Sequence, residues 1–159
     1  MPARAAIGRQ GEPRRVSDYP STAALGTEEC EQGRRNCKDD GMALIVDCVL
    51  IDCADLDVMT AFWCQALDLE HIWTGPSGGH LLAAVDGSGR RLALMPSRVE
   101  KAVKNRVHFD LRPDDQQVEV RRLEGLGARR IDIGQADVTW VVMADPEGNE
   151  FCVLRSRVE

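Results

Sequence analysis

The alternation of apolar and polar residues predicts a strand, a helix and three further strands after residue 42. Residues 43–51 are rich in β-branched side chains, which is typical of a strand, and Asp55 can then cap a helix. The buried side of this helix is predicted from apolar residues at positions i, i+3, i+4 and i+7: Met59, Phe62, Trp63 and Ala66. Short strands are expected at 69–74, 79–85 and 90–95, and the D-G-S-G turn at 86–89 indicates a hairpin.

The same order of elements recurs in the second half of the chain. Residues 106–111 alternate apolar and polar side chains as a half-buried strand does, and Pro113 suits the start of a helix. The apolar positions of that helix are Val120, Leu123 and Leu126, and Gly127 suits a left-handed stop. Three more strands are expected at 128–133, 138–143 and 150–154.

This order predicts an α+β fold of two tandem βαβββ modules, at about 43–96 and 105–155. We expect the eight strands to form one cupped, mixed sheet with the helices on its convex face. The concave face would then enclose a cavity. A ferredoxin-like fold is the alternative, but its four strands would leave about half of the expected strands unplaced.

Residues 1–41 lack apolar periodicity and mix Arg, Gly, Glu, Ser and Pro. Such a segment buries too little surface to offset its ordering entropy, so we expect a disordered or loosely attached leader before a domain at 42–159. Met42 directly precedes the first strand and is a candidate for the true start of translation.

The net charge of −6 argues against a nucleic-acid partner, which would require clustered Lys and Arg. No apolar run is long enough to span a bilayer, and no signal-type segment is present, so we expect a cytoplasmic protein without membrane contact. The six cysteines include no C-x-x-C pair, and Cys48, Cys64 and Cys152 lie in apolar contexts typical of buried, reduced thiols.

Three segments carry a resemblance to a known family. V-H-F-D-L at 107–111, the helix end at 121–130 and D-P-E-G-N-E-F-C-V-L at 145–154 resemble the second module of the glyoxalase/bleomycin resistance/extradiol dioxygenase (vicinal oxygen chelate) superfamily. The segment at 52–63 resembles the glyoxalase-like subgroup common in high-GC bacteria, and the similarity covers roughly residues 44–155. Members of the superfamily are usually dimers or pseudo-dimers, and they include isomerases, lyases, dioxygenases and drug-binding resistance proteins.

The resemblance implies metal ligands on the first and last strand of each module, which are His108 and Glu150 in the second module. Strand alternation places His108 on the same face as Arg106 and Asp110. An imidazole and a carboxylate that meet in a cavity could hold zinc, iron, manganese or nickel. The alternative is that no cofactor binds and both residues simply line the pocket.

The first module departs from the family pattern. The position of His108 corresponds to Val49 or Leu50 there, and the position of Glu150 corresponds to about Arg91. An apolar side chain cannot bind a metal and a guanidinium repels one, so only half of the ligand set is present. His80, on a strand that could face inward, is a possible third ligand.

The pocket is expected to contain the following residues: Arg106, His108, Asp110, Glu150, Trp73, Trp140 and His80. Trp73 and Trp140 could stack on a flat ligand or pack in the core, whereas Trp63 is expected in the core. We therefore expect a homodimeric small-molecule-binding protein that takes up a metabolite or an antibiotic. The alternatives are a metal-dependent lyase, isomerase or ring-cleaving dioxygenase that uses His108 and Glu150, and an interaction domain without a small ligand.

Overall fold

A computed structural model of the chain describes residues 45–156, all of which belong to one compact unit. The expected leader at 1–41, the candidate start at Met42 and the beginning of the first expected strand lie outside the described residues.

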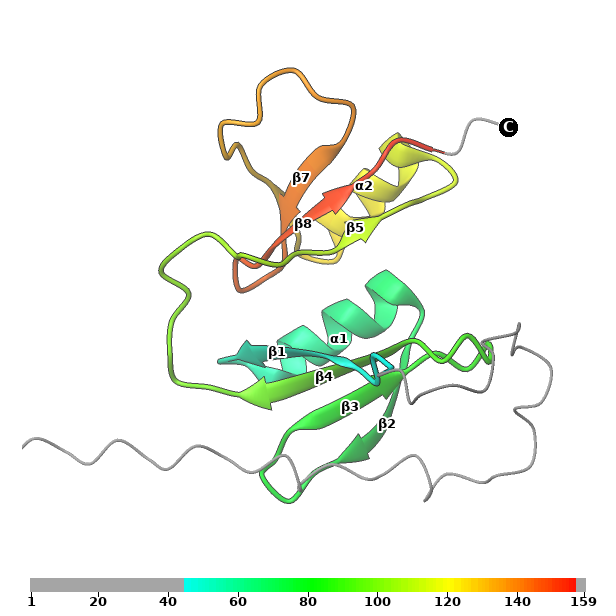
Figure 1. The fold of residues 1–159 in the computed structure, drawn as a ribbon, viewed down its shortest axis with the longest axis vertical. Helices are drawn as coiled ribbons and strands as arrows, with labels where there is room; N and C mark the ends of the chain where they lie inside the picture. The colour runs from blue at the N-terminus through cyan, green and yellow to red at the C-terminus, as the bar shows by residue number, and fades with distance from the viewer. Residues whose placement is uncertain (1–44, 157–159) are drawn as a thin grey trace, which may run out of the picture. The chain divides into compact units, whose positions relative to one another are not determined.

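The first module has the predicted order of one strand, one helix and three strands (Figure 1). Its elements are β1 (Val49–Cys53), α1 (Leu56–Leu67), β2 (Glu70–Thr74), β3 (His80–Ala83) and β4 (Arg91–Pro96). The strands form a sheet in the order β1-β4-β3-β2, in which β1 runs parallel to β4 and the other neighbours are antiparallel.

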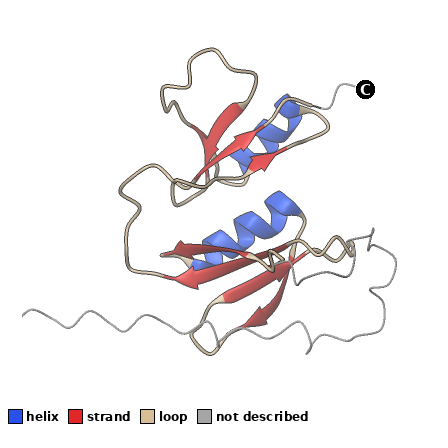
Figure 2. Ribbon diagram, viewed as in Figure 1, coloured by secondary structure: helices blue, strands red, loops and turns tan. Residues whose placement is uncertain are grey.

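The second module repeats this topology. Its elements are β5 (Asp110–Leu111), α2 (Gln116–Gly125), β6 (Arg129–Arg130), β7 (Val141–Ala144) and β8 (Glu150–Val153). The sheet order is β5-β8-β7-β6, again with a single parallel pair. Figure 2 shows one helix beside the strands of each module. The prediction of an α+β fold with two tandem βαβββ modules is confirmed. The expected single eight-stranded sheet is not formed: the eight strands of the described residues lie in two separate four-stranded mixed sheets, because each set of strands pairs only within its own module.

The strand register defines which residues of the two modules are equivalent. Ala83 pairs with Arg91 at the loop end of the β3–β4 hairpin, and Ala144 pairs with Glu150 at the same point of the β7–β8 hairpin. Arg91 is therefore the first-module counterpart of Glu150, as the sequence predicts.

The same register places Ala93 and Cys152 at equivalent positions, two residues further along. The β1 partner of Ala93 is Leu50, and the β5 partner of Cys152 is Asp110. Leu50 is therefore the counterpart of Asp110.

Cys48 lies two residues before Leu50, and His108 lies two residues before Asp110. Cys48 is therefore the first-module counterpart of His108. The prediction of Val49 or Leu50 for this position was wrong. A sequence comparison that lacks the pairing is uncertain by one or two residues, and each one-residue step moves a side chain to the other face of the sheet.

Each helix begins at an aspartate that caps it. The Asp55 carboxylate accepts a hydrogen bond of 3.0 Å from the Val58 amide, and the Asp115 carboxylate accepts one of 2.9 Å from the Val118 amide. An aspartate at this position satisfies one of the free N–H groups of the first turn. The local sequence thus starts both helices at equivalent points of the repeat.

A single hydrophobic core joins the two modules. Trp63 of α1 is 1% exposed and makes edge-to-face contacts with Phe62 of its own helix, at 5.0 Å between ring centroids, and with Phe109 at 5.4 Å. It also contacts Phe151 of β8 at 5.7 Å. The prediction that Trp63 belongs to the core is confirmed, and α1 packs against both sheets.

Of the strand expected at 106–111, only Asp110–Leu111 forms a strand, and the residues before it lie in a loop with bends at Arg106 and Val107. Pairing with β8 begins only where the Cys152 amide donates to the Phe109 carbonyl, at 2.8 Å. Val107, expected on the buried face together with Phe109 and Leu111, is 81% exposed because it lies before the paired stretch. The strand expected at 128–133 is also shorter, with only Arg129–Arg130 in β6.

None of the described helices is both long enough and apolar enough to cross a bilayer.

The end of α2 is set by Gly127, which adopts a φ of +107°. The Ala128 amide donates to the Leu123 carbonyl at 3.0 Å and the Gly127 amide donates to the Glu124 carbonyl at 3.1 Å, the hydrogen-bond pair of a Schellman motif. The predicted left-handed stop at Gly127 is confirmed.

Two neighbouring glycines should respond oppositely to alanine. Gly127→Ala should lower the free energy of unfolding by about 1–2 kcal/mol, because a Cβ disfavours this backbone conformation. Gly125→Ala, inside α2 and with open space around the added Cβ, should raise it by roughly 0.5–1 kcal/mol. Urea denaturation of both variants provides the measurement, and equal effects would contradict the assigned helix end.

Candidate functional site

A cavity of about 790 Å³ lies along β1 and the segment that connects the modules. This volume is within the usual range for small-molecule sites. The predicted pocket residues Arg106, His108 and Glu150 all line it. The rest of the wall comes from Val49–Asp52, Trp63, Ser97, Val99–Asn105, Val107, Phe109, Glu147 and Asn149.

The Glu150 carboxylate is already bound on both oxygens. Its Oε1 accepts from the Lys101 ammonium at 2.8 Å, and its Oε2 accepts from the Asn105 amide at 3.0 Å. The Glu150 side chain is only 10% exposed and that of Lys101 22%. Burial alone raises the pKa of Glu150, but the hydrogen bonds from Lys101, Asn105 and its own backbone amide, together with the charge of Lys101, outweigh it, so the net shift is downward.

These contacts test whether His108 and Glu150 can share a divalent ion. A metal needs free lone pairs on the carboxylate, whereas both Glu150 oxygens have partners and an ammonium group lies against one of them. The Glu150 carboxylate in this arrangement does not fit a metal ion. Sequence reasoning missed Lys101 because it lies 49 residues from Glu150 in a connecting segment without periodicity.

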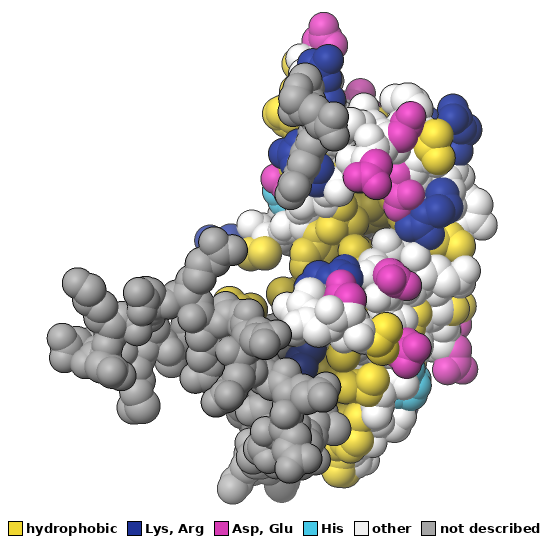
Figure 3. Space-filling view, turned by 90° about the vertical axis from the view of Figure 1, so that its right-hand side faces the viewer, with side chains coloured by type: hydrophobic (Ala, Val, Ile, Leu, Met, Phe, Trp, Pro, Cys, Tyr) yellow, Lys and Arg dark blue, Asp and Glu magenta, His cyan; other side chains and the backbone are white. Residues whose placement is uncertain are grey.

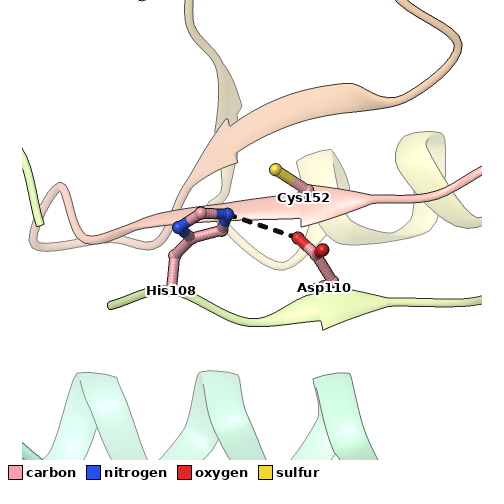
Figure 4. A group of neighbouring side chains, drawn as sticks. All are labelled: His108, Asp110 and Cys152. Atoms are coloured by element: carbon pink, nitrogen blue, oxygen red, sulfur yellow. Dashed lines mark ion pairs between the residues drawn. The ribbon is translucent and has the colours of Figure 1, made fainter. Parts of the chain in front are cut away.

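His108 instead belongs to a cluster with Asp110 and Cys152 (Figure 4). The His108 Nε2 lies 3.3 Å from the Asp110 Oδ1, and the Cys152 thiol is close enough to Asp110 for this carboxylate to raise the thiol pKa. One ligand atom from each of the three residues lies within 4.8 Å of the others. His108 and Asp110 are exposed, whereas Cys152 is 6% exposed.

The electrostatics of this cluster disfavour a nucleophilic thiol. Burial and the negative charge of the adjacent Asp110 raise the pKa of Cys152 to about 11. The thiol is therefore protonated at neutral pH, and nucleophilic cysteines require a lowered pKa. The sequence held a signal for this cluster, because Cys152 shares a strand face with Glu150, but the pairing of Cys152 with Asp110 comes from the fold.

The turn before β8 connects the second module to the start of α1. The Glu147 carboxylate accepts hydrogen bonds from the Ala54 amide, at 2.8 and 2.9 Å, and from the Asp55 amide at 2.6 Å. A carboxylate is favoured beside the free amides and positive dipole end of a helix. Asp145, 1% exposed, accepts hydrogen bonds from the Glu147 and Asn149 amides, so Asp145 and Asn149 shape the turn.

Of the seven residues expected in the pocket, four do not line this cavity: Asp110, which lines the second cavity described below, and His80, Trp73 and Trp140. The His80 Nδ1 lies 2.8 Å from the Thr60 hydroxyl, and its ring stacks on His71 at 4.1 Å. Trp73 is half-buried on β2, and Trp140, just before β7, is 40% exposed. The fold does not bring the side chains of His80, Trp73 and Trp140 together with His108, because they lie outside the cavity wall formed by β1 and the connecting segment.

A second cavity, of about 800 Å³, contains the first-module counterparts of His108 and Glu150. It includes Cys48 and Arg91, and the Arg91 guanidinium lies 3.3 Å from the Asp47 carboxylate. Its lining includes the apolar side chains of Leu67, Leu69 and Leu111. Figure 3 shows one face of the chain, on which hydrophobic side chains gather between charged ones. The two cavities thus occupy equivalent places in the two modules with different chemistry.

Comparisons with known proteins agree with this fold. The family model of the glyoxalase-like domain matches residues 48–154. No curated protein matched the sequence significantly.

Solved structures with the same fold include two fosfomycin resistance proteins of the FosX type. One is a variant from Listeria monocytogenes in complex with Mn(II) and a dihydroxypropylphosphonic acid, with a TM-score of 0.56 and 16% sequence identity. The matched region covers 74% of the present chain and 94% of the Listeria chain. The other, from Mesorhizobium loti, has a TM-score of 0.57 and 14% identity over 74% and 95%.

A third similar structure is a glyoxalase/bleomycin resistance protein/dioxygenase family enzyme from Burkholderia phytofirmans. It has a TM-score of 0.54 and 17% identity and covers 68% of this chain and 95% of its own. At these identities the likeness concerns the fold.

Removing the Lys101 ammonium should destabilise the chain through Glu150. Lys101→Met leaves a largely buried carboxylate with one partner fewer, which should cost about 1–3 kcal/mol at neutral pH. Because the folded pKa of Glu150 is lowered, its contribution is present above the ordinary value of 4.5 and is lost as the pH falls through the folded value. Urea denaturation should therefore show the difference from the wild type at neutral pH and its disappearance in acid.

Lys104→Met is the matched control for this prediction. Lys104 lies in the same connecting segment, and within residues 45–156 its ammonium makes one hydrogen bond, to the Asn105 carbonyl at 3.5 Å, and no ion pair. A change of less than about 0.5 kcal/mol is expected for such a surface site. A pH-independent loss in Lys101→Met would show that Glu150 is not the group affected.

Proposed function

Because the chain belongs to the glyoxalase-like domain family, we propose that it binds a small organic molecule in the cavity lined by Arg106, His108 and Glu150. The observation that carries this proposal is the ion pair between Glu150 and Lys101. The Lys101 ammonium takes the place beside the carboxylate that a bound cation would need. Ligand binding in this cavity therefore needs no metal at Glu150.

The lining favours a ligand with an apolar body. Val49, Leu50 and Ile51 of β1 contribute to one wall, and Val99 and Val103 of the connecting segment contribute to another. Apolar surface of this kind supplies binding free energy in proportion to the area that leaves water.

The polar part of the ligand should be a hydrogen-bond acceptor such as a carboxylate or phosphonate. Glu147 and Glu150 are both engaged within the protein, and Lys101 is engaged with Glu150. Arg106, by contrast, makes no ion pair or hydrogen bond with any residue of 45–156. A guanidinium presents a planar fork of donors that matches a carboxylate or phosphonate.

A divalent-metal-dependent lyase, isomerase or dioxygenase remains the alternative function. The Listeria FosX structure with Mn(II) supports it at the level of the fold. The two functions differ in their response to a chelator. Ligand binding that persists in EDTA supports the metal-free proposal, and binding that requires added Mn²⁺ supports the enzyme.

We also propose that the chain forms a homodimer, as expected from the family resemblance. Exposed apolar residues that do not line the cavity, Val58 of α1 at 45% and Val118 of α2 at 54%, supply surface that a partner would cover. Light scattering across a range of protein concentrations would decide between monomer and dimer.

A thermal-shift screen of small carboxylates, phosphonates and matched amines tests the ligand class. Hits are expected among the anions, and a ligand at about 100 times its dissociation constant should stabilise the chain by roughly 2.7 kcal/mol. Arg106→Ala should weaken the best hit about 10- to 100-fold, the usual effect of removing a charged hydrogen-bond donor.

Arg98→Ala is the matched control, since Arg98 lies in the same connecting segment but does not line the cavity. It should bind the hit like the wild type. A hit that tolerates Arg106→Ala, or a preference for amines, would refute the proposed ligand class.

A further inference from the structure

We propose that His108, Asp110 and Cys152 form a binding site for a transition metal of the zinc class. The site goes beyond the ligand-binding function proposed above and does not depend on it. It shares only His108 with the ligand pair expected from the sequence, because Glu150 is bound to Lys101.

The distances between the three side chains suit a tetrahedral ion. Zinc binds nitrogen, oxygen and sulfur at about 2.0–2.3 Å, which places neighbouring ligand atoms of a tetrahedron about 3.3–3.8 Å apart. The His108 Nε2 and the Asp110 Oδ1 are separated by 3.3 Å, and all three ligand atoms lie within 4.8 Å of one another. Separations longer than this tetrahedral range would have to shorten when an ion binds.

The backbone under the cluster is already fixed. Asp110 and Cys152 are register partners in the parallel β5–β8 pair, and His108 lies two residues before Asp110. The Cys152 amide donates to the Phe109 carbonyl at 2.8 Å, and the Leu154 amide donates to the Leu111 carbonyl at 2.7 Å. Figure 4 shows the imidazole, the carboxylate and the thiol directed toward one region.

The donor set selects among metals. One imidazole, one carboxylate and one thiol favour Zn²⁺, Co²⁺, Ni²⁺ or Cu²⁺, whereas Mn²⁺, Mg²⁺ and Ca²⁺ prefer oxygen ligands. On binding, the Cys152 thiol releases its proton to solvent and bonds to the ion as a thiolate. Three protein ligands leave one tetrahedral position for water or for a donor atom of a ligand.

Cobalt provides a direct test, because a thiolate bound to Co²⁺ gives a sulfur-to-cobalt charge-transfer absorption. The full chain should first carry Cys30→Ser and Cys37→Ser, since these two thiols of the N-terminal segment could also bind cobalt. Titration with Co²⁺ should then develop the band to one ion per chain, and Zn²⁺ should remove it. Mn²⁺ should not compete.

Variants of the three ligands give the deciding comparison. Cys152→Ser should abolish the charge-transfer band. His108→Gln and Asp110→Asn should each weaken the binding of Co²⁺ by roughly 100-fold or more, since even residues that only support a ligand cost 10- to 100-fold when removed. His108 and Asp110 are exposed, so these two variants test the site even if Cys152→Ser does not fold.

Two other residues serve as matched controls. Cys53 is buried and has a thiol pKa raised to about 11, like Cys152, but belongs to no comparable ligand group among residues 45–156. Cys53→Ser and His71→Gln should therefore keep the band. The absence of a band in the wild type, or its persistence in Cys152→Ser, would overturn the site. Failure of the proposed ligand-binding function would instead appear in the thermal-shift screen, as the absence of any organic ligand that binds in the presence of EDTA. Cobalt plays no part in that measurement.

Discussion

The burial of Trp63 is the interaction on which the arrangement of the two modules depends. Its indole contacts Phe109 and Phe151 of the second module from a helix of the first. A buried tryptophan removes about 150–250 Å² from water, worth an upper estimate of about 4–6 kcal/mol. That is a large part of the net stability of a small domain. Because Trp63 also lines the cavity beside His108, the same contact that joins the modules forms part of the candidate binding site.

Around this core, the two modules use equivalent positions with opposite charges. Arg91 of the first module pairs with Asp47, and Glu150 of the second pairs with Lys101. In both cases the partner comes from the segment that precedes the first strand of its module. Both modules thus have an ion pair at the loop end of the last strand. The strand residue is the cation in the first module, Arg91, and the anion in the second, Glu150. Each module therefore neutralises this position internally.

Local sequence patterns were sufficient for much of the fold. The helical spacing of Met59, Phe62 and Trp63 predicted the buried face of α1, and all three residues are buried. Asp55 and Gly127 predicted the start of one helix and the end of the other, because capping depends on a few neighbouring backbone groups. The placement of His108 and Glu150 at one cavity also followed from strand alternation and the family resemblance.

The sequence by itself determined the two βαβββ modules, their helix ends and the residues that could carry chemistry, since these depend on period and local hydrogen bonding. The tertiary structure alone decided which of those residues meet. The partners of Glu150 lie 45 and 49 residues away in a segment without periodicity, and Cys48 was identified as the counterpart of His108 only by strand register. Trp73, Trp140 and His80 have suitable side chains, but they lie outside the cavity wall. The physical reason is that long-range pairing, which no local pattern encodes, sets which side chains share one space.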